Sequence, residues 1–186
     1  MEDIELKKAQ RREALHRRRS LSGEEREKNS SVIRENILQI LKEREHKKVF
    51  SYCATPEEAD LDDLNRLLEE SGVKVFYPVT GESGSMEAVA PEGGRWGEDR
   101  FGIRIPLDGT AAEPEEIDVV LIPCVSFDRK KNRMGYGKGY YDRYLQRCPQ
   151  ALKIAAAFSC QQTDALACEE TDMPMDIIVT EKEILK

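Results

Sequence analysis

The chain has 186 residues and a formal net charge of -7, and 39% of its residues are hydrophobic while 35% are charged. This composition is typical of a soluble globular protein and excludes intrinsic disorder, and the length suits a single domain over residues 1–186. No apolar run approaches the ~20 residues of a membrane-spanning helix, and the N-terminus lacks the apolar segment of a secretory signal. We therefore expect a cytoplasmic protein with no membrane partner.

The first half of the chain predicts helices alternating with buried strands. A helix is expected over about 4–19, and a second begins after Ser22, which has capping-box spacing to Glu25. Apolar strands are expected over 48–54 and 73–79. Between them a third helix is predicted, and its start and end signals are Thr55 as N-cap, Pro56 at the first position, Glu58 closing a capping box, and Gly72 after the last turn.

The second half predicts more strands around one glycine-rich loop. Residues 80–96 are rich in turn residues, with a short strand expected at 86–90. A loop this long inside a compact domain is often functional, and Thr80–Trp96 is our candidate for a lid over the substrate. Strands are also expected over 101–107, 117–127, 152–159 and 175–181, with 117–127 the best candidate for the sheet centre, and a helix can begin near residue 140. This order favours a three-layer α/β fold with a mostly parallel sheet.

Positive charge is concentrated in residues 1–48 and 129–147 of this otherwise acidic chain. Two basic segments in an acidic protein suggest a local anion site rather than a surface that coats nucleic acid. The five cysteines have no C-x-x-C spacing, so neither a disulfide framework nor a zinc site is expected. Both histidines lie in charged helical sequence, so a histidine-based catalytic centre is not expected either.

The segment "RMGYGKGYYDRYL" over residues 133–145 combines the features of a phosphate site. Its alternating glycines allow the backbone to aim N–H groups at an anion, and the start of the next helix would add more donors. Lys138 and Arg133 supply positive charge, and Asp142 is placed to hold Mg²⁺. The segment matches neither a Walker A loop nor the dinucleotide fingerprint, and most glycine-rich segments are turns. The residues alone therefore indicate an α/β protein that binds an anion.

The longer stretch "FDRKKNRMGYGKGYYDRYL" resembles the signature of the 5-formyltetrahydrofolate cyclo-ligase family. The family pattern is F-D-x-x-G-x-R-L-G-x-G-x-G-[YF]-[YF]-D-x-[YF]-L. The N-terminal "KKAQRREALHRRRSLSGEER", the "EEAD" after a strand, and the terminal "MDIIVTE" are also similar to family segments. The resemblance implies a three-layer α/β/α architecture of the NagB/RpiA/CoA transferase-like, Rossmann-like kind.

The resemblance further implies a reaction that uses ATP as co-substrate and Mg²⁺ as cofactor. The formyl oxygen of 5-formyltetrahydrofolate would be phosphorylated, and attack by N10 with loss of phosphate would give 5,10-methenyltetrahydrofolate. Phosphoryl transfer needs positioning and charge stabilisation, which cations, backbone donors and a metal provide. The nucleophile belongs to the substrate, so a shortage of histidine is no obstacle. The partners implied are these two small molecules, with a monomer or weak dimer expected.

Family roles carry over to individual positions. Arg133 and Lys138 are the expected catalytic residues. The expected ATP contacts are Lys7, Arg11, Arg133, Gly135, Gly137, Lys138, Gly139, Tyr140 and Tyr141. The expected folate contacts are Glu58, Met86, Phe101, Tyr136 and Tyr140, and the expected metal ligands are Asp142 and Asp176.

Several of these residues also have an ordinary structural interpretation. Lys7 and Arg11 fit a solvated helix face, and Glu58 fits the closing position of a capping box. Asp176 is suited to the start of a strand, while Met86 and Phe101 are typical core residues.

Four positions depart from the family pattern. Lys131 stands where a glycine is usual, Leu61 where a threonine is usual, and Ile105 where many bacterial members have glutamate. Met134 replaces leucine, which is a conservative core-type change. These changes affect the expected folate contacts more than the ATP contacts, so an ATP-dependent kinase or ligase for another small molecule is an alternative. An RNA-binding module, with tyrosines stacking on bases beside cations, is a further alternative that the acidic net charge disfavours.

Overall fold

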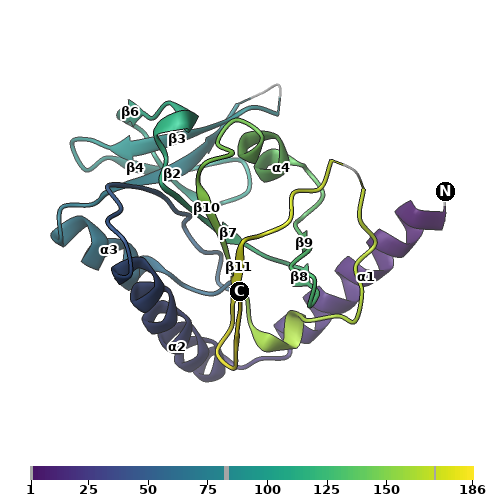
Figure 1. Cartoon of the computed structure of the whole chain (residues 1–186). Helices are drawn as coiled ribbons and strands as arrows, with labels where there is room; N and C mark the ends of the chain where they lie inside the picture. Colours follow the sequence, from purple (N-terminus) through teal and green to yellow (C-terminus); the bar gives the residue numbers. More distant parts are fainter. Residues whose placement is uncertain (1, 82–83, 170) are drawn as a thin grey trace.

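The structure is a computed structural model that describes residues 2–81, 84–169 and 171–186 of the chain (Figure 1). None of the helices in these ranges is long and apolar enough to cross a membrane. The α-helices are α1 (Glu2–Arg19), α2 (Gly23–Lys42), α3 (Asp62–Glu70) and α4 (Tyr140–Leu145), and the short 3-10 turns are η1 (Pro114–Glu116) and η2 (Ser159–Gln161).

The strands form one large sheet and two small ones. The large sheet has eight strands in the order β12-β11-β10-β7-β1-β2-β3-β6, and β4 pairs with β5 and β8 with β9. The strand bounds are β1 (Lys48–Phe50), β2 (Lys74–Thr80), β3 (Met86–Pro91), β4 (Trp96–Glu98), β5 (Arg104–Pro106), β6 (Gly109–Ala111), β7 (Val119–Pro123), β8 (Ser126–Phe127), β9 (Arg133–Met134), β10 (Leu152–Ala156), β11 (Ile177–Val179) and β12 (Ile184–Leu185).

The centre of the large sheet is parallel, as its apolar strands predict. β7 lies between β1 and β10, and the register pairs Val119 with Val49 and Leu121 with Ile154. β2 and β11 continue the parallel part, and β3, β6 and β12 are antiparallel to their neighbours. The predicted central strand and the mostly parallel sheet are confirmed. Continuous apolar sequence in β7 is explained by burial on both faces of the sheet.

Helices cover the two faces of this sheet and create two cores. On one face α2 and α3 contribute Ile33, Ile37, Leu64 and Leu68, which pack with alternate strand residues such as Leu121. On the opposite face α4 contributes Tyr144 and Leu145, which pack with the intervening strand residues such as Val120 and Ile122. Figure 1 shows α2 and α4 on either side of the strands. The three-layer prediction is therefore confirmed.

The capping box at the start of α2 is present as predicted. The Ser22 hydroxyl accepts a hydrogen bond from the Glu25 amide (3.1 Å), and the Glu25 carboxylate accepts one from the Ser22 amide (2.7 Å). The predicted start of the third helix at Pro56 is wrong, because α3 begins only at Asp62.

Tertiary contacts explain why residues 55–61 do not become helical. The Glu58 carboxylate does accept a hydrogen bond from the Thr55 amide (2.9 Å), but only one turn forms. The Tyr52 hydroxyl donates to the Ala59 carbonyl (2.6 Å), and the Asp60 amide donates to the Ser30 hydroxyl on α2 (3.0 Å). These bonds occupy backbone groups that a helix would need, and they hold the segment as a loop over the carboxyl end of β1.

The structure corrects one expected strand and confirms another. The strand expected over 101–107 is shorter, and it pairs with β4 outside the large sheet. The short strand expected over 86–90 is confirmed as β3, which forms a hairpin with β2 in which Tyr77 faces Val89. Residues 82 and 83 of the proposed lid lie outside the described residues. The strand at 177–179 is followed by β12, which the sequence analysis missed because it has only two residues.

Leu61 provides a test of this loop. Leu61 is fully buried in the α2–α3 core, whereas Leu67 on α3 is 46% exposed. We expect Leu61→Ala to lower the free energy of unfolding by about 2–5 kcal/mol, since it leaves a cavity, and Leu67→Ala to lower it by less than about 1 kcal/mol. Urea unfolding followed by circular dichroism measures both values. Equal losses would contradict the placement of Leu61.

Candidate active site

The glycine loop over 135–139 follows the carboxyl end of the central strand. From β7 the chain passes through the β8–β9 hairpin, then the loop, then α4. Arg133 on β9 links this hairpin to the end of β7, because its Nη1 donates a hydrogen bond to the Pro123 carbonyl (3.3 Å). Ligands of open α/β sheets bind at such strand ends.

Each glycine of the loop packs against an arginine from a different element. A Cβ atom at Gly135, Gly137 or Gly139 would lie 3.0, 3.1 or 2.8 Å from the nearest guanidinium nitrogen of Arg133, Arg11 or Arg143, respectively. Gly137 and Gly139 also have positive φ angles of 85° and 66°, which disfavour side chains.

Hydrogen bonds fix two of these arginines to the loop. Arg11 Nε donates to the Gly135 carbonyl (2.9 Å), and Arg143 Nη2 donates to the Lys138 carbonyl (3.0 Å). Lys138 itself is exposed. The loop therefore concentrates positive charge around a backbone whose carbonyl groups are already bonded, which suits the binding of a polyanion.

A buried ion pair connects the loop to α4. Arg133 Nη2 lies 3.2 Å from Asp142 Oδ1, and the two side chains are 3% and 23% exposed. The Arg133 guanidinium also lies over the Tyr141 ring, 5.6 Å from its centre. Arg133 Nε is buried without a hydrogen-bond partner within the described ranges. The predicted residues Arg133, Tyr141 and Asp142 are thus brought together.

A distant segment of the chain, which carries Asp172, contacts Asp142 through a backbone amide. The amide of Met173 lies 3.5 Å from Asp142 Oδ1, and the preceding Asp172 accepts a 2.6 Å bond from Lys7 Nζ on α1. Burial lowers the pKa of Lys7, but its hydrogen bonds to Asp172 and Glu169 outweigh this effect and raise it overall. The sequence analysis overlooked Asp172, which lies in an irregular segment without a recognised pattern.

Asp176 lies elsewhere. It precedes β11 at the amino end of the parallel strands, and its carboxylate accepts bonds from the Lys153 amide (2.8 Å) and from Lys153 Nζ (3.3 Å). The structure therefore does not bring Asp176 together with the loop at the carboxyl end of β7. This arrangement matches the alternative interpretation of Asp176 as a strand-start residue.

The carboxylate beside the positive loop has the chemistry of a magnesium ligand. Among the described residues no group of three or more His, Cys, Asp or Glu side chains is arranged to hold a metal. Mg²⁺ in proteins is often held by only one or two carboxylates, with phosphate oxygens and water completing the shell. Asp142 provides such oxygen donors, and Asp172 immediately precedes the Met173 amide that contacts it.

Glu58, Tyr136 and Arg18 form a hydrogen-bonded cluster at the loop, which we call the acidic corner. The Tyr136 hydroxyl donates to Glu58 Oε1 (3.1 Å) and accepts from Arg18 Nη2 on α1 (2.7 Å). Arg18 is 1% exposed, and Glu58 is 7% exposed. Burial first and the Glu58 carboxylate second raise the pKa of Tyr136. Arg18 was not predicted, because nothing in a run of three arginines distinguishes the buried one.

The β4–β5 hairpin reaches the start of α4. Arg100 at its tip donates to the Tyr140 hydroxyl (2.8 Å), and the neighbouring Phe101 ring is 52% exposed under the Arg100 guanidinium. Met86 on β3 is 4% exposed and packs in the same core as Tyr140. Phe101 is therefore accessible to a ligand. Met86 is mainly a core residue, although it also lines a small cavity together with Tyr140.

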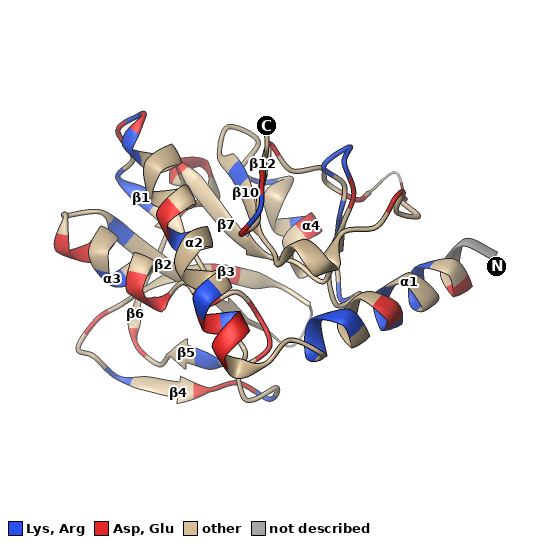
Figure 2. Cartoon of the chain, turned by 90° about the horizontal axis from the view of Figure 1, so that it is seen from below, with Lys and Arg blue, Asp and Glu red and all other residues tan. Residues whose placement is uncertain are grey.

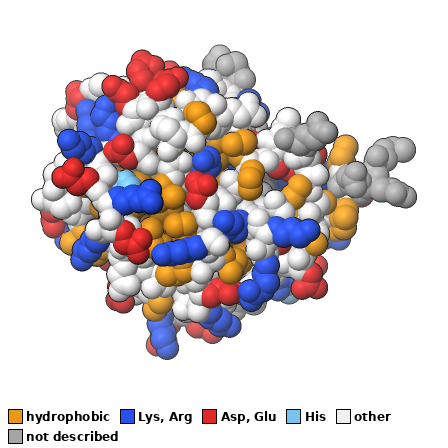
Figure 3. All heavy atoms as spheres, viewed as in Figure 1, with side chains coloured by type: hydrophobic (Ala, Val, Ile, Leu, Met, Phe, Trp, Pro, Cys, Tyr) orange, Lys and Arg blue, Asp and Glu red, His pale blue; other side chains and the backbone are white. Residues whose placement is uncertain are grey.

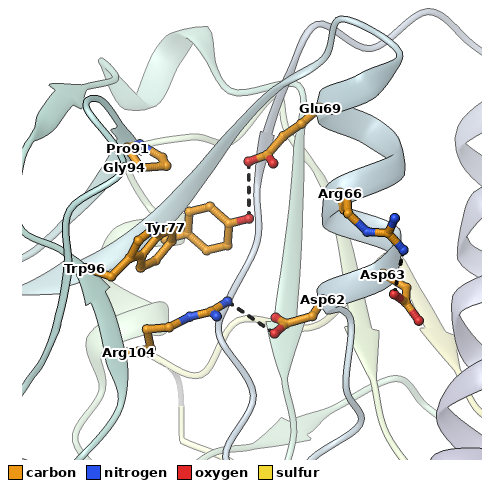
Figure 4. A pocket seen from close by; sticks show the side chains of 9 residues that line it. All are labelled: Asp62, Asp63, Arg66, Glu69, Tyr77, Pro91, Gly94, Trp96 and Arg104. Atoms are coloured by element: carbon orange, nitrogen blue, oxygen red, sulfur yellow. Dashed lines mark hydrogen bonds and ion pairs between the residues drawn. The ribbon is translucent and has the colours of Figure 1, made fainter.

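A cavity of about 490 Å³ lies beside α3 and contains none of the predicted site residues. Figure 4 shows that its charged side chains are paired with one another. Arg104 bonds to Asp62 (3.2 Å), Arg66 bonds to Asp63 (2.9 Å), and the Tyr77 hydroxyl bonds to Glu69 (3.4 Å). We place the active site at the glycine loop, because Arg11, Lys138 and Arg143 form no ion pair within the described ranges, although Arg133 and Lys7 do.

Charge on the surface is mixed in sign. Figure 2 shows that blue Lys and Arg segments recur along α1, which extends beside the sheet. On the face seen in Figure 3, Lys and Arg side chains are interspersed with Asp and Glu and with hydrophobic side chains. This face lacks the continuous basic surface that an RNA-binding module would use.

Comparisons with other proteins agree with this geometry. The model of the 5-formyltetrahydrofolate cyclo-ligase family matches residues 3–181. A mouse 5-formyltetrahydrofolate cyclo-ligase is 27% identical, over 94% of this chain and 93% of its own, and one from Haemophilus influenzae is 28% identical, over 87% and 91%. The NMR structure of 5,10-methenyltetrahydrofolate synthetase from Aquifex aeolicus superposes with a TM-score of 0.86 at 34% identity, covering 97% of this chain and 92% of its own.

The acidic corner can be tested by titration. We expect Glu58→Gln to lower the pKa of Tyr136 toward its ordinary value, because the substitution removes a neighbouring negative charge. NMR of ¹³C-labelled tyrosine follows the phenol directly, and Glu57→Gln is a matched control one residue away that lacks a bond to Tyr136. A pKa of Tyr136 that stays the same or rises in Glu58→Gln would refute the contact.

Proposed function

The chain belongs to the 5-formyltetrahydrofolate cyclo-ligase family and is an enzyme with that activity, and we propose that it uses Mg-ATP to activate the formyl group before ring closure. The γ-phosphoryl group of ATP passes to the formyl oxygen and ADP leaves. N10 of the substrate then attacks the activated formyl carbon. Loss of phosphate leaves the new C–N bond of 5,10-methenyltetrahydrofolate.

The observation that carries the proposal is the packing of three arginines around the glycine loop. Arg11, Arg133 and Arg143 surround its backbone, and the exposed Lys138 follows Gly137. Phosphoryl transfer is accelerated mainly by positioning and by stabilisation of negative charge on the phosphate oxygens. We assign the triphosphate to this loop. Lys138 and Arg133 would contact the transferred phosphoryl group, and Lys7 and Arg11 would contact the triphosphate from α1.

Asp142 and Asp172 would hold the magnesium ion. When bound there, Mg²⁺ would neutralise phosphate charge and orient the oxygens of ATP. Arg133 directs the Asp142 carboxylate through its 3.2 Å bond. Lys7, now bonded to Asp172, can turn to phosphate oxygens when a cation takes its place on that carboxylate.

The acidic corner suits the pterin end of the folate. A carboxylate pairs well with neighbouring N–H donors on a planar ring, and Glu58 is held for this task by the Thr55 amide and the Tyr136 hydroxyl. Phe101 and Tyr140 offer aromatic surface across the cleft. The departure at Leu61 does not weaken this assignment, because the Leu61 side chain is fully buried in the core.

The proposal predicts a strong effect of one exposed lysine. We expect Lys138→Ala to reduce kcat/KM for ATP by about 10- to 100-fold, the value of a charge-assisted hydrogen bond of about 1.5–3 kcal/mol. The fold should be intact because Lys138 is exposed. Absorbance of the methenyl product and release of ADP are measured together. Lys130→Ala, which removes another exposed cation before the loop, is the matched control.

Two results would contradict the assignment. Unchanged ATP kinetics in Lys138→Ala, with Lys130→Ala equally unaffected, would remove Lys138 from the phosphate site. ADP release that does not depend on 5-formyltetrahydrofolate, without any rise in methenyl absorbance, would instead indicate a kinase or ligase for another small molecule.

A further inference from the structure

Arg18 is a buried cation of the acidic corner that has no role in the reaction proposed above. It lies in the last turn of α1, and its side chain is 1% exposed. Arginine is rarely buried unless it is fully paired, because burial removes its charge from water. The pairing of Arg18 is incomplete, since its Nε is buried without a hydrogen-bond partner among the described residues. A contribution to stability alone therefore explains this residue poorly.

The three consecutive arginines of α1 have different contacts. Arg17 Nε donates to the Cys160 carbonyl (2.7 Å) and fixes α1 to the η2 turn. Arg19 is exposed, and its Nε donates to the Glu57 carboxylate (3.1 Å). Only Arg18, the buried member of the three, reaches the glycine loop. The position of α1 is thus maintained by bonds that do not involve Arg18.

Arg18 contacts three separate segments of the chain. Its Nη2 donates to the Tyr136 hydroxyl (2.7 Å) and lies 3.4 Å from Glu57 Oε2, and its Nη1 donates to the Cys124 carbonyl after β7 (3.4 Å). The bond to Tyr136 is the shortest of these. Burial lowers the pKa of Arg18, but the bond to Tyr136 and the nearby Glu58 charge outweigh this effect and raise it overall. Arg18 is therefore a permanent cation against the Tyr136 hydroxyl.

This contact fixes the direction of the hydrogen bonds in the acidic corner. Arginine can only donate, and a tyrosine hydroxyl has a single proton. Because the Tyr136 oxygen accepts from Arg18, its own proton is directed to Glu58 Oε1 (3.1 Å). The other oxygen, Glu58 Oε2, accepts from the Thr55 amide (2.9 Å). A carboxylate has about four lone-pair positions, so each Glu58 oxygen retains one for a donor of a ligand.

We infer that Arg18 is a positioning residue for the substrate, which holds the Tyr136 hydroxyl on Glu58 and so keeps this carboxylate in a fixed orientation for the pterin. The inference rests on the proposed placement of the pterin at Glu58. Arg18 acts through Tyr136, whose side chain is 49% exposed although its hydroxyl is held. Arg11 and Arg143 fix the loop backbone by bonds of their own, so the binding of ATP does not depend on Arg18.

A binding experiment that needs no turnover tests this role. Calorimetric titration with 5-formyltetrahydrofolate in the absence of ATP should show a Kd about tenfold higher in Arg18→Gln than in the wild type, which corresponds to about 1.4 kcal/mol. In steady-state kinetics KM for the folate should rise, with KM for ATP and kcat unchanged. Arg19→Gln is the matched control and should match the wild type, because it removes the next cation, which bonds to Glu57 but not to Tyr136.

Tyr136 distinguishes positioning from a general loss of stability. Tyr136→Phe keeps the ring and removes the hydroxyl, so adding Arg18→Gln to it should cause no further rise in Kd. Arg18→Gln alone should raise the pKa of Tyr136, because it removes a donor and a positive charge that lower this pKa. NMR of ¹³C-labelled tyrosine measures this shift, which Arg19→Gln should not produce. Additive effects on Kd, or a Tyr136 pKa that stays the same or falls in Arg18→Gln, would overturn the inference.

Glu58→Gln separates this inference from the proposed function. An unchanged Kd for the folate in Glu58→Gln would show that the pterin placement is wrong, and the role of Arg18 would fall with it. A raised Kd in Glu58→Gln together with an unchanged Kd in Arg18→Gln would overturn the inference alone. If circular dichroism shows that Arg18→Gln does not fold, Tyr136→Phe decides the question, since it should also raise the Kd, and an unchanged Kd there would refute the positioning role.

Discussion

The packing of guanidinium groups against glycines is the constraint on which the site depends. Arg133, Arg11 and Arg143 come from β9, α1 and α4, and each occupies the space that a side chain at the facing glycine would fill. The hydrogen bonds of Arg11 and Arg143 to loop carbonyls fix the backbone while leaving positive charge at its surface. The same arginines therefore determine both the shape of the loop and its positive charge. A substitution at a loop glycine or at its facing arginine would change both.

Tyr136 connects the two halves of the chemistry. It belongs to the glycine loop, yet its hydroxyl bonds to Glu58 beyond β1 and to the buried Arg18 of α1. The cations that suit phosphate and the carboxylate that suits the pterin are thus held at a fixed separation. In the proposed reaction the attacking nitrogen belongs to the substrate, so the protein would supply position and charge rather than a nucleophile or histidine of its own.

Local patterns predicted most of the fold but only part of the site. The capping box at Ser22 and the apolar run of β7 depend on neighbouring residues, so they could be recognised in the chain. The equally good signal at Thr55 failed, because bonds from Tyr52 and to Ser30 hold that segment as a loop. Remote partners could not be predicted: burial alone distinguishes Arg18 from its neighbours, and the irregular segment that carries Asp172 contacts Asp142 through the Met173 amide. Lys131 adopts the left-handed conformation (φ 66°), which glycine adopts more readily than lysine, so the glycine usual at this position has a physical reason.

The central claim is that ATP phosphorylates the formyl oxygen of the folate in the cleft beside this loop. The most direct test uses 5-formyltetrahydrofolate with ¹⁸O in the formyl group and follows the label by mass spectrometry of the released phosphate. If the formyl oxygen accepts the phosphoryl group, the label leaves with inorganic phosphate and ADP stays unlabelled. Unlabelled phosphate released in step with methenyl product would contradict the account, since it would show that the oxygen left the folate without passing through a phosphorylated formyl group.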